Sequence, residues 1–159
     1  MRKPPFAALY SNYSSNKKIA KDALFKEIGW NDLINDQTYD NTCAVRVSLA
    51  LIKAGIPLRG RIKIKVGPNK GALIEPGQQK LAELLASDAY FWKPEKLSAK
   101  NAGAKIGSRQ GIIAFMRIPG YHNGRGGHID LVSVSAGGYY ACASDCYWNA
   151  SEIWFWKLK

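Results

Sequence analysis

The sequence predicts an α+β fold in which one buried helix packs on an antiparallel β-sheet. Three observations point to this class. Residues 42–53 form a helical segment that is apolar around most of its circumference, the last third of the chain contains several strand-like segments, and short turns separate those strands. A length of 159 residues suits one core, so we expect residues 1–159 to form a single domain.

The helix at residues 42–53 is the best defined element. Asn41 or Asp40 can cap its start, and Gly55 is placed to end it. Apolar side chains point in most directions around the helix and leave only a narrow polar edge, which includes Arg46. A helix of this kind is expected at the centre of the molecule.

The other elements of the first two thirds are less strongly patterned. Apolar residues at helical spacing predict helices at residues 17–28 and 77–86. Strict alternation of apolar and basic residues predicts a half-buried strand at 60–66. Residues 93–110 are rich in Lys, Ala, Gly and Ser, and we expect them to form a long surface connection.

The last third of the chain is expected to form an antiparallel meander. A glycine-rich loop at 119–127 and a turn at 135–138 separate its first strands. The predicted strands cover residues 112–118, 128–134, 139–143 and 153–158.

The charge of the chain is strongly positive. Lys and Arg number 23 and Asp and Glu 12, giving a net charge of +11, which favours nucleic acid, an acidic lipid surface or an acidic polymer such as a cell wall. No apolar run approaches the ~20 residues that span a bilayer, and the N-terminus lacks the apolar segment of a Sec signal peptide. We therefore expect neither membrane insertion nor Sec export.

Cys43 is the sharpest candidate for chemistry. It occupies the first turn of the buried helix, where free backbone N–H groups and the helix dipole stabilise a thiolate and where its own N–H can help to hold an oxyanion. Burial as a small apolar residue is the alternative. A catalytic cysteine needs a general base, and His128, at the start of a strand, is better placed than His122 within the glycine-rich loop.

The imidazole in turn needs a carboxylate that orients it. Asp145, which follows the strand at 139–143, can reach back to His128 from the neighbouring strand. Asp130 shares a strand face with His128 and can line the site, but its approach to the correct ring nitrogen is less natural.

The remaining cysteines, Cys142 and Cys146, can form a small disulfide or remain two unrelated thiols. A zinc site is poorly supported because two thiols and one histidine lack a fourth ligand at the proper spacing. We expect no metal and no organic cofactor.

The order of these residues, a cysteine at the head of a buried helix followed by a histidine on a later antiparallel strand, resembles that of papain-like and NlpC-type cysteine peptidases. At the level of motifs the chain is similar to the type VI secretion amidase effectors, family four. The motifs are 41–48 (NTCAVRVS), 127–131 (GHIDL) and 142–146 (CASDC).

The resemblance implies an antibacterial toxin, made in the cytoplasm and delivered by the type VI secretion machinery into the periplasm of a target cell without a signal peptide. It implies cleavage of the amide between the γ-carboxyl of D-glutamate and meso-diaminopimelate in the peptidoglycan stem peptide. Cys43 matches the nucleophile, His128 the general base and Asp145 the third member. It also implies a cognate immunity protein that plugs the cleft.

Two other functions stay open on the residues alone. One is a basic nuclease that uses His122 or His128 with Lys and Arg, and the other is a nucleic-acid-binding module without enzymatic activity. The chain contains no recognised nucleic-acid motif, so we expect no nucleic-acid partner.

Overall fold

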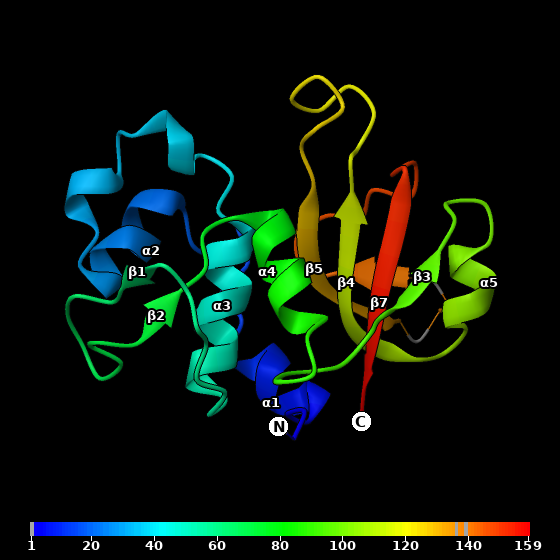
Figure 1. Cartoon of the computed structure of the whole chain (residues 1–159), viewed down its shortest axis with the longest axis horizontal. Coiled ribbons are helices and arrows are strands. Elements are labelled where there is room, and N and C mark those ends of the chain that lie inside the picture. The colour runs from blue at the N-terminus through cyan, green and yellow to red at the C-terminus, as the bar shows by residue number, and fades with distance from the viewer. Residues whose placement is uncertain (1, 136, 139) are drawn as a thin grey trace.

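The computed structural model describes residues 2–135, 137–138 and 140–159, and it is organised around the helix α3 (Cys43–Lys53). On one side of α3 lies a small N-terminal lobe, and on the other lies a five-stranded sheet (Figure 1). The N-terminal lobe contains α2 (Lys21–Ile28), two single-turn helices (Asn31–Leu33 and Gln37–Tyr39), β1 (Ile62–Lys63) and β2 (Leu73–Ile74).

The sheet is antiparallel throughout and confirms the predicted class. Its strand order is β3-β7-β4-β5-β6. The strands cover Glu95–Leu97 (β3), Gln110–Met116 (β4), His128–Val134 (β5), Tyr140–Cys142 (β6) and Glu152–Leu158 (β7). Strands β4, β5 and β6 form the predicted meander, whereas β7 returns to lie between β3 and β4. Residues 136 and 139, in the expected turn and at the start of the expected strand 139–143, lie outside the described residues.

Helix α3 contributes to two hydrophobic cores at once. One face packs with α1 (Phe6–Ser11) and α4 (Gln78–Leu85) against the sheet, while Val45 and Leu49 pack into the core of the N-terminal lobe. The helix ends as predicted, because Gly55 adopts the left-handed φ of +86°. Shared packing of this kind fixes the start of α3 between the lobe and the sheet.

Arg46 corrects the expectation of a polar edge on α3. Its side chain is buried, with only 2% of the residue exposed. Hydrogen bonds to Thr42 and to the carbonyl of Ser14, in the segment between α1 and α2, hold it there.

Two predictions about the middle of the chain are wrong. The strand expected at 60–66 shrinks to the two residues of β1. The N–H of Ile64 still donates across the hairpin to Ala72, but the N–H of Lys65 donates to the carbonyl of Ile28 at the end of α2, so the pairing does not continue. The connection expected at 93–110 contains β3 and the helix α5 (Ala102–Ile106). Only the two end residues of α5 are buried, which is too sparse a pattern to reveal a helix.

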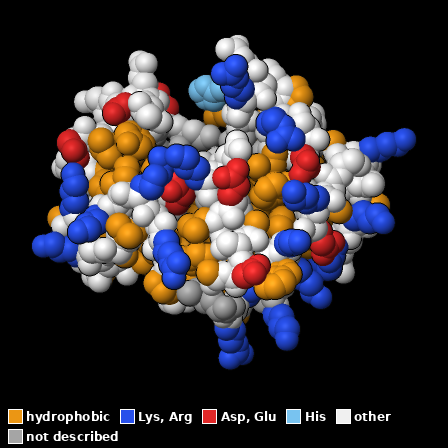
Figure 2. Space-filling view, in the orientation of Figure 1, with side chains coloured by type: hydrophobic (Ala, Val, Ile, Leu, Met, Phe, Trp, Pro, Cys, Tyr) orange, Lys and Arg blue, Asp and Glu red, His pale blue; other side chains and the backbone are white. Residues whose placement is uncertain are grey.

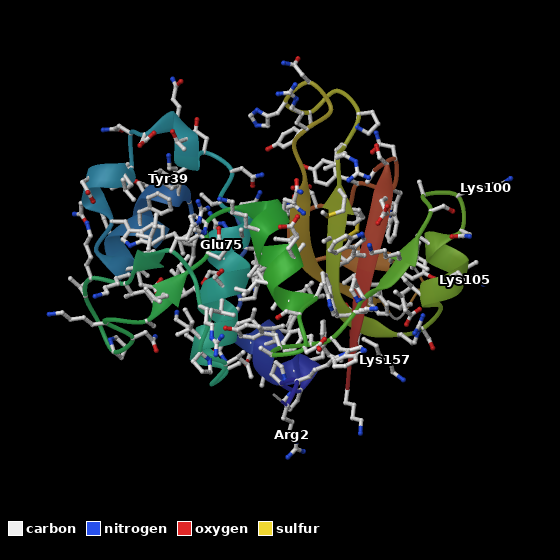
Figure 3. The ribbon with its side chains drawn as sticks, in the orientation of Figure 1. Arg2, Tyr39, Glu75, Lys100, Lys105 and Lys157 are labelled. Carbon is white, nitrogen blue, oxygen red and sulfur yellow. A yellow bond between two sulfur atoms is a disulfide. The ribbon has the colours of Figure 1, made fainter. Side chains whose placement is uncertain are left out.

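A buried carboxylate fixes the start of α4. Glu75, which Figure 3 places beside α3, receives a bidentate interaction from Arg61 and accepts the backbone N–H of Gly77 at 2.9 Å. The carbonyl of Glu75 also accepts the hydroxyl of Ser48 on α3, at 3.1 Å. These bonds tie α3, the end of β2 and the start of α4 together.

The surface matches the basic composition. Lys and Arg side chains spread over the face shown in Figure 2 and outnumber the acidic ones there. Lys100 and Lys105 point outward from the edge beyond β3, and Arg2 points away at the opposite end of the molecule from the 117–127 loop (Figures 1 and 3). In the described part of the chain, the helices are all too short or too polar to cross a bilayer.

Candidate active site

The start of α3 opens into a cleft of about 290 Å³. The cleft lies between the N-terminal lobe and the 117–127 loop, where the surface in Figure 2 is indented. Its lining combines charged, hydroxyl and aromatic side chains with the sulfur of Cys43. The lining residues are Asn16, Ala20, Lys21, Asp40, Asn41, Thr42, Cys43, Arg46, Tyr121, His128, Ser144, Asp145 and Tyr147.

Asn41 connects the helix start to the histidine strand. Its Oδ1 accepts the backbone N–H of Cys43 at 3.2 Å, and its Nδ2 donates to the carbonyl of Gly127 at 3.0 Å. The N-cap residue of α3 is Thr42, and its side chain forms no capping hydrogen bond. Asn41, one residue earlier, instead accepts the first backbone N–H of the helix. The Cys43 N–H that was expected to hold an oxyanion is engaged by this side chain.

His128 begins β5 and faces Cys43. Its ring is held between Phe115, at 6.2 Å between ring centroids, and Tyr147, at 5.1 Å. The imidazole is hydrogen-bonded to the Cys43 sulfur, and its Nε2 lies 2.9 Å from Oδ2 of Asp130. Burial lowers the pKa of His128, but the hydrogen bonds to Asp130 and Cys43 outweigh burial and raise the pKa to about 9. At neutral pH the ring is an imidazolium.

Asp130 holds the position that was predicted for Asp145. Its fully buried carboxylate accepts hydrogen bonds from the imidazole and from the backbone N–H groups of Leu131, Ser144 and Asp145, at 2.7 to 3.0 Å. Asp145 lines the cleft and presents its backbone, rather than its carboxylate, to this cluster. The sequence feature that points to Asp130 is its two-residue spacing from His128, which places both side chains on one face of β5.

A disulfide joins Cys142 and Cys146, whose Cα atoms are 5.4 Å apart. It closes the short loop that carries the backbone N–H groups of Ser144 and Asp145. The hydroxyl of Ser144 also lies 3.2 Å from that of Tyr13. The loop is therefore fastened from two sides while it holds the Asp130 carboxylate.

The alternative base, His122, lies on the exposed part of the 117–127 loop. Its ring packs edge-on against Tyr121, with the centroids 4.6 Å apart, and Tyr121 is the residue of this loop that lines the cleft. Within the described ranges, no group of three or more His, Cys, Asp or Glu side chains is arranged to hold a metal ion. The geometry thus unites Cys43, His128 and Asp130.

Gly127 leaves no room for a side chain beside the histidine. A Cβ there lies 2.2 Å from Oε1 of Gln78 and 2.7 Å from the carbonyl oxygen of Phe115. We expect Gly127→Ala to displace the start of β5, to destabilise the fold by about 1–3 kcal/mol, and to lower activity by about tenfold or more because 1 Å of misplacement is costly.

Thermal unfolding and hydrolysis rates test this expectation. The control is Gly124→Asn, in the same loop, where no heavy atom lies within 4 Å of an added Cβ and where asparagine tolerates the φ of +74°. Equal effects of the two substitutions would contradict the steric account.

Comparisons with known proteins agree with this arrangement. The family model described as type VI secretion system, amidase effector protein 4 (Tae4) matches residues 39–156. The Tae4–Tai4 effector–immunity complex from Enterobacter cloacae gives a TM-score of 0.77 at 20% identity, covering 99% of this chain and 100% of that one. The effector alone from that organism gives 0.76 at 21% identity, with 99% and 98% covered. No curated protein sequence matches at a significant level.

A Tae4–Tai4 complex from Salmonella Typhimurium also matches, with a TM-score of 0.71 at 19% identity, covering 99% of this chain and 100% of that one. These structures share the fold and confirm the α+β class with an antiparallel sheet. The nuclease and nucleic-acid-binding alternatives receive no support. Because the family model spans most of the chain, the protein belongs to the type VI secretion amidase effectors, family four, and is an antibacterial amidase that acts on peptidoglycan.

Proposed function

We propose that the enzyme is a DL-endopeptidase that cleaves the amide between the γ-carboxyl of D-glutamate and meso-diaminopimelate. The observation that carries the proposal is the hydrogen bond between the Cys43 sulfur and a buried imidazole whose other side is held by Asp130. Asp130 takes the role that the sequence suggested for Asp145, which instead supports Asp130 through its backbone N–H.

The reaction proceeds through a thioester. The Cys43 thiolate attacks the γ-carbonyl carbon of the D-glutamyl residue and forms a tetrahedral intermediate. The His128 imidazolium then gives its proton to the departing amine of diaminopimelate as the C–N bond breaks. The neutral imidazole next removes a proton from water. The resulting hydroxide attacks the thioester carbonyl carbon, the C–S bond breaks, and the glutamyl carboxylate and the Cys43 thiolate are released. Asp130 keeps the ring oriented through both steps.

Activity is expected to fall as the pH rises through about 9, because deprotonated His128 cannot protonate the leaving amine. The same pKa shift affects stability. The pKa in the unfolded chain is about 6.5, so the protonated ring stabilises the fold fully below about pH 6.5 and loses this contribution as the pH rises through about 9. A pH–rate profile with unfolding measured in parallel tests both, and constant activity through about pH 10 contradicts the assignment.

The cellular setting follows from the relatives. Two of the matched structures are described as effector–immunity complexes. We propose that this chain, acting as one amidase domain over residues 1–159, is delivered into the target cell's periplasm and that the producer makes a cognate immunity protein that covers the Cys43 cleft. The positive surface suits the anionic wall.

Mass spectrometry of digested peptidoglycan tests the proposed bond. The expected products are glycan-linked stems that end in D-glutamate and peptides that begin with a new diaminopimelate amino group. The Cys43→Ala protein, incubated in parallel, is the blank. Products cleaved at any other stem bond, without this pair, contradict the proposal.

A further inference from the structure

Arg46 is a buried cation that the mechanism above does not use. It lies one helical turn after Cys43 on α3 and lines the same cleft. Its Nε donates to Oγ1 of Thr42 at 2.8 Å, and its Nη1 donates to the carbonyl of Ser14 at 2.9 Å. Both acceptors are neutral, so these bonds orient the guanidinium without neutralising its charge.

The charge of Arg46 has no carboxylate partner among the residues that the structure describes. Of the cleft carboxylates, Asp40 is paired with Lys21 at 2.9 Å, and Asp145 lines the cleft without forming an ion pair with Arg46. An arginine stays charged in a protein and has five N–H donors, of which two are used here. The remaining donors are available to a ligand in the cleft.

A buried, unpaired charge is costly, and the free energy is recovered when an anion binds. The described part of the chain leaves no fully buried side-chain nitrogen without a hydrogen bond, so the unused edge of the guanidinium is reached by solvent. Burial lowers the pKa of Arg46, and the nearby Tyr13 and Cys43 partly oppose that lowering. Arg46 and Cys43 line the same cleft.

We propose that Arg46 binds the α-carboxylate of the D-glutamyl residue whose γ-amide is cleaved. This inference rests on the proposed function. In a γ-linked glutamyl residue, two methylene groups and the α-carbon separate the scissile carbonyl from a free carboxylate. Cys43 and Arg46 are three residues apart on α3, so their side chains lie on one side of the helix and line the same cleft.

The planar guanidinium suits this task because it can form two parallel hydrogen bonds to a carboxylate. A residue without a second carboxyl group has no free carboxylate at this position, so the contact selects for a glutamyl residue in the acyl half of the substrate. The carboxylate belongs to the acyl half of the substrate and stays bound in the thioester. Arg46 thus contributes to both half-reactions.

The experiment compares two muropeptides that differ only in the glutamyl α-group, a carboxylate or a carboxamide. We expect wild-type enzyme to cleave the carboxamide with a kcat/KM about 10- to 100-fold lower, because one charged hydrogen-bonded pair is lost. Arg46→Lys and Arg46→Gln are expected to lose activity on the carboxylate and to discriminate by less than about threefold. Lys21→Gln, which removes the lysine of the cleft, is expected to keep the discrimination.

Several outcomes overturn the inference. Equal cleavage of both muropeptides by wild-type enzyme does so without any variant, so the test survives an Arg46 variant that fails to fold. If amidation of the diaminopimelate carboxylate, rather than of the glutamyl α-carboxylate, lowers the activity in an Arg46-dependent way, Arg46 binds the leaving group instead. If the Arg46 variants lose activity equally on both substrates and Cys43 is alkylated more slowly in them, Arg46 stabilises the thiolate and does not bind the substrate. Wild-type enzyme that cleaves none of them contradicts the proposed function itself.

Discussion

Replacing Cys43 with alanine is expected to lower peptidoglycan hydrolysis by about 10⁴-fold or more. The variant retains the helix start, the Asn41 bridge and the His128–Asp130 pair but has no atom that can form the thioester. The fold should lose only about 1 kcal/mol, since the deleted sulfur is small. Chromatography of released peptides, with circular dichroism as the control for folding, measures both effects.

Cys43→Ser is the matched second variant. It keeps a polar atom of similar size next to His128, but a hydroxyl does not ionise near neutral pH, so we expect it to be nearly as inactive as the alanine variant. Turnover by either variant within about tenfold of wild type contradicts a sulfur nucleophile.

Asp130→Asn is expected to lower kcat by about 10²- to 10⁴-fold, whereas Asp145→Asn changes it by less than about threefold. Both substitutions replace one carboxylate oxygen with an NH₂ group, and the two residues lie close together around the site. In Asp130→Asn the amide NH₂ group must face either the Leu131 N–H, which binds Oδ1, or the N–H groups of Ser144 and Asp145, which bind Oδ2. The imidazole also loses its anionic partner. In Asp145→Asn the backbone N–H that supports Asp130 remains.

The pH profile separates a chemical role for Asp130 from a merely structural one. Because the hydrogen bond to Asp130 is the largest contribution that raises the pKa of His128, Asp130→Asn should move the alkaline loss of activity to lower pH. Asp145→Asn should leave the profile in place. If Asp145→Asn lowers kcat and shifts the profile more than Asp130→Asn does, Asp145 is the residue that orients the ring.

The helix that carries Cys43 could be predicted because its signals are local. Asn41 before it, a continuous apolar pattern within it and Gly55 after it all lie within one short window of sequence. His128 could be predicted for the same reason, since the glycine loop ends where β5 begins. Their meeting in space depends on how α3 packs on β5, and the sequence supplied it only through the resemblance.

The identity of the third residue could not be predicted because it depends on contacts distant in sequence. Strand alternation placed Asp130 on the face of His128, but the carboxylate is held there by backbone N–H groups from the disulfide loop. A periodic pattern contains no information about those donors. The burial of Arg46 could not be predicted for a related reason, since its partner Ser14 lies 32 residues away in the sequence.

The most direct test of the central claim, a Cys43 thiolate paired with a protonated His128, is the rate at which iodoacetamide alkylates Cys43 in wild-type and His128→Ala protein near pH 6. Cys43 is the free cysteine, since Cys142 and Cys146 are joined, so intact mass reports one site. The account predicts rapid single alkylation of wild-type protein and a rate about 10²-fold lower without the imidazole. Equal rates in the two proteins would contradict it.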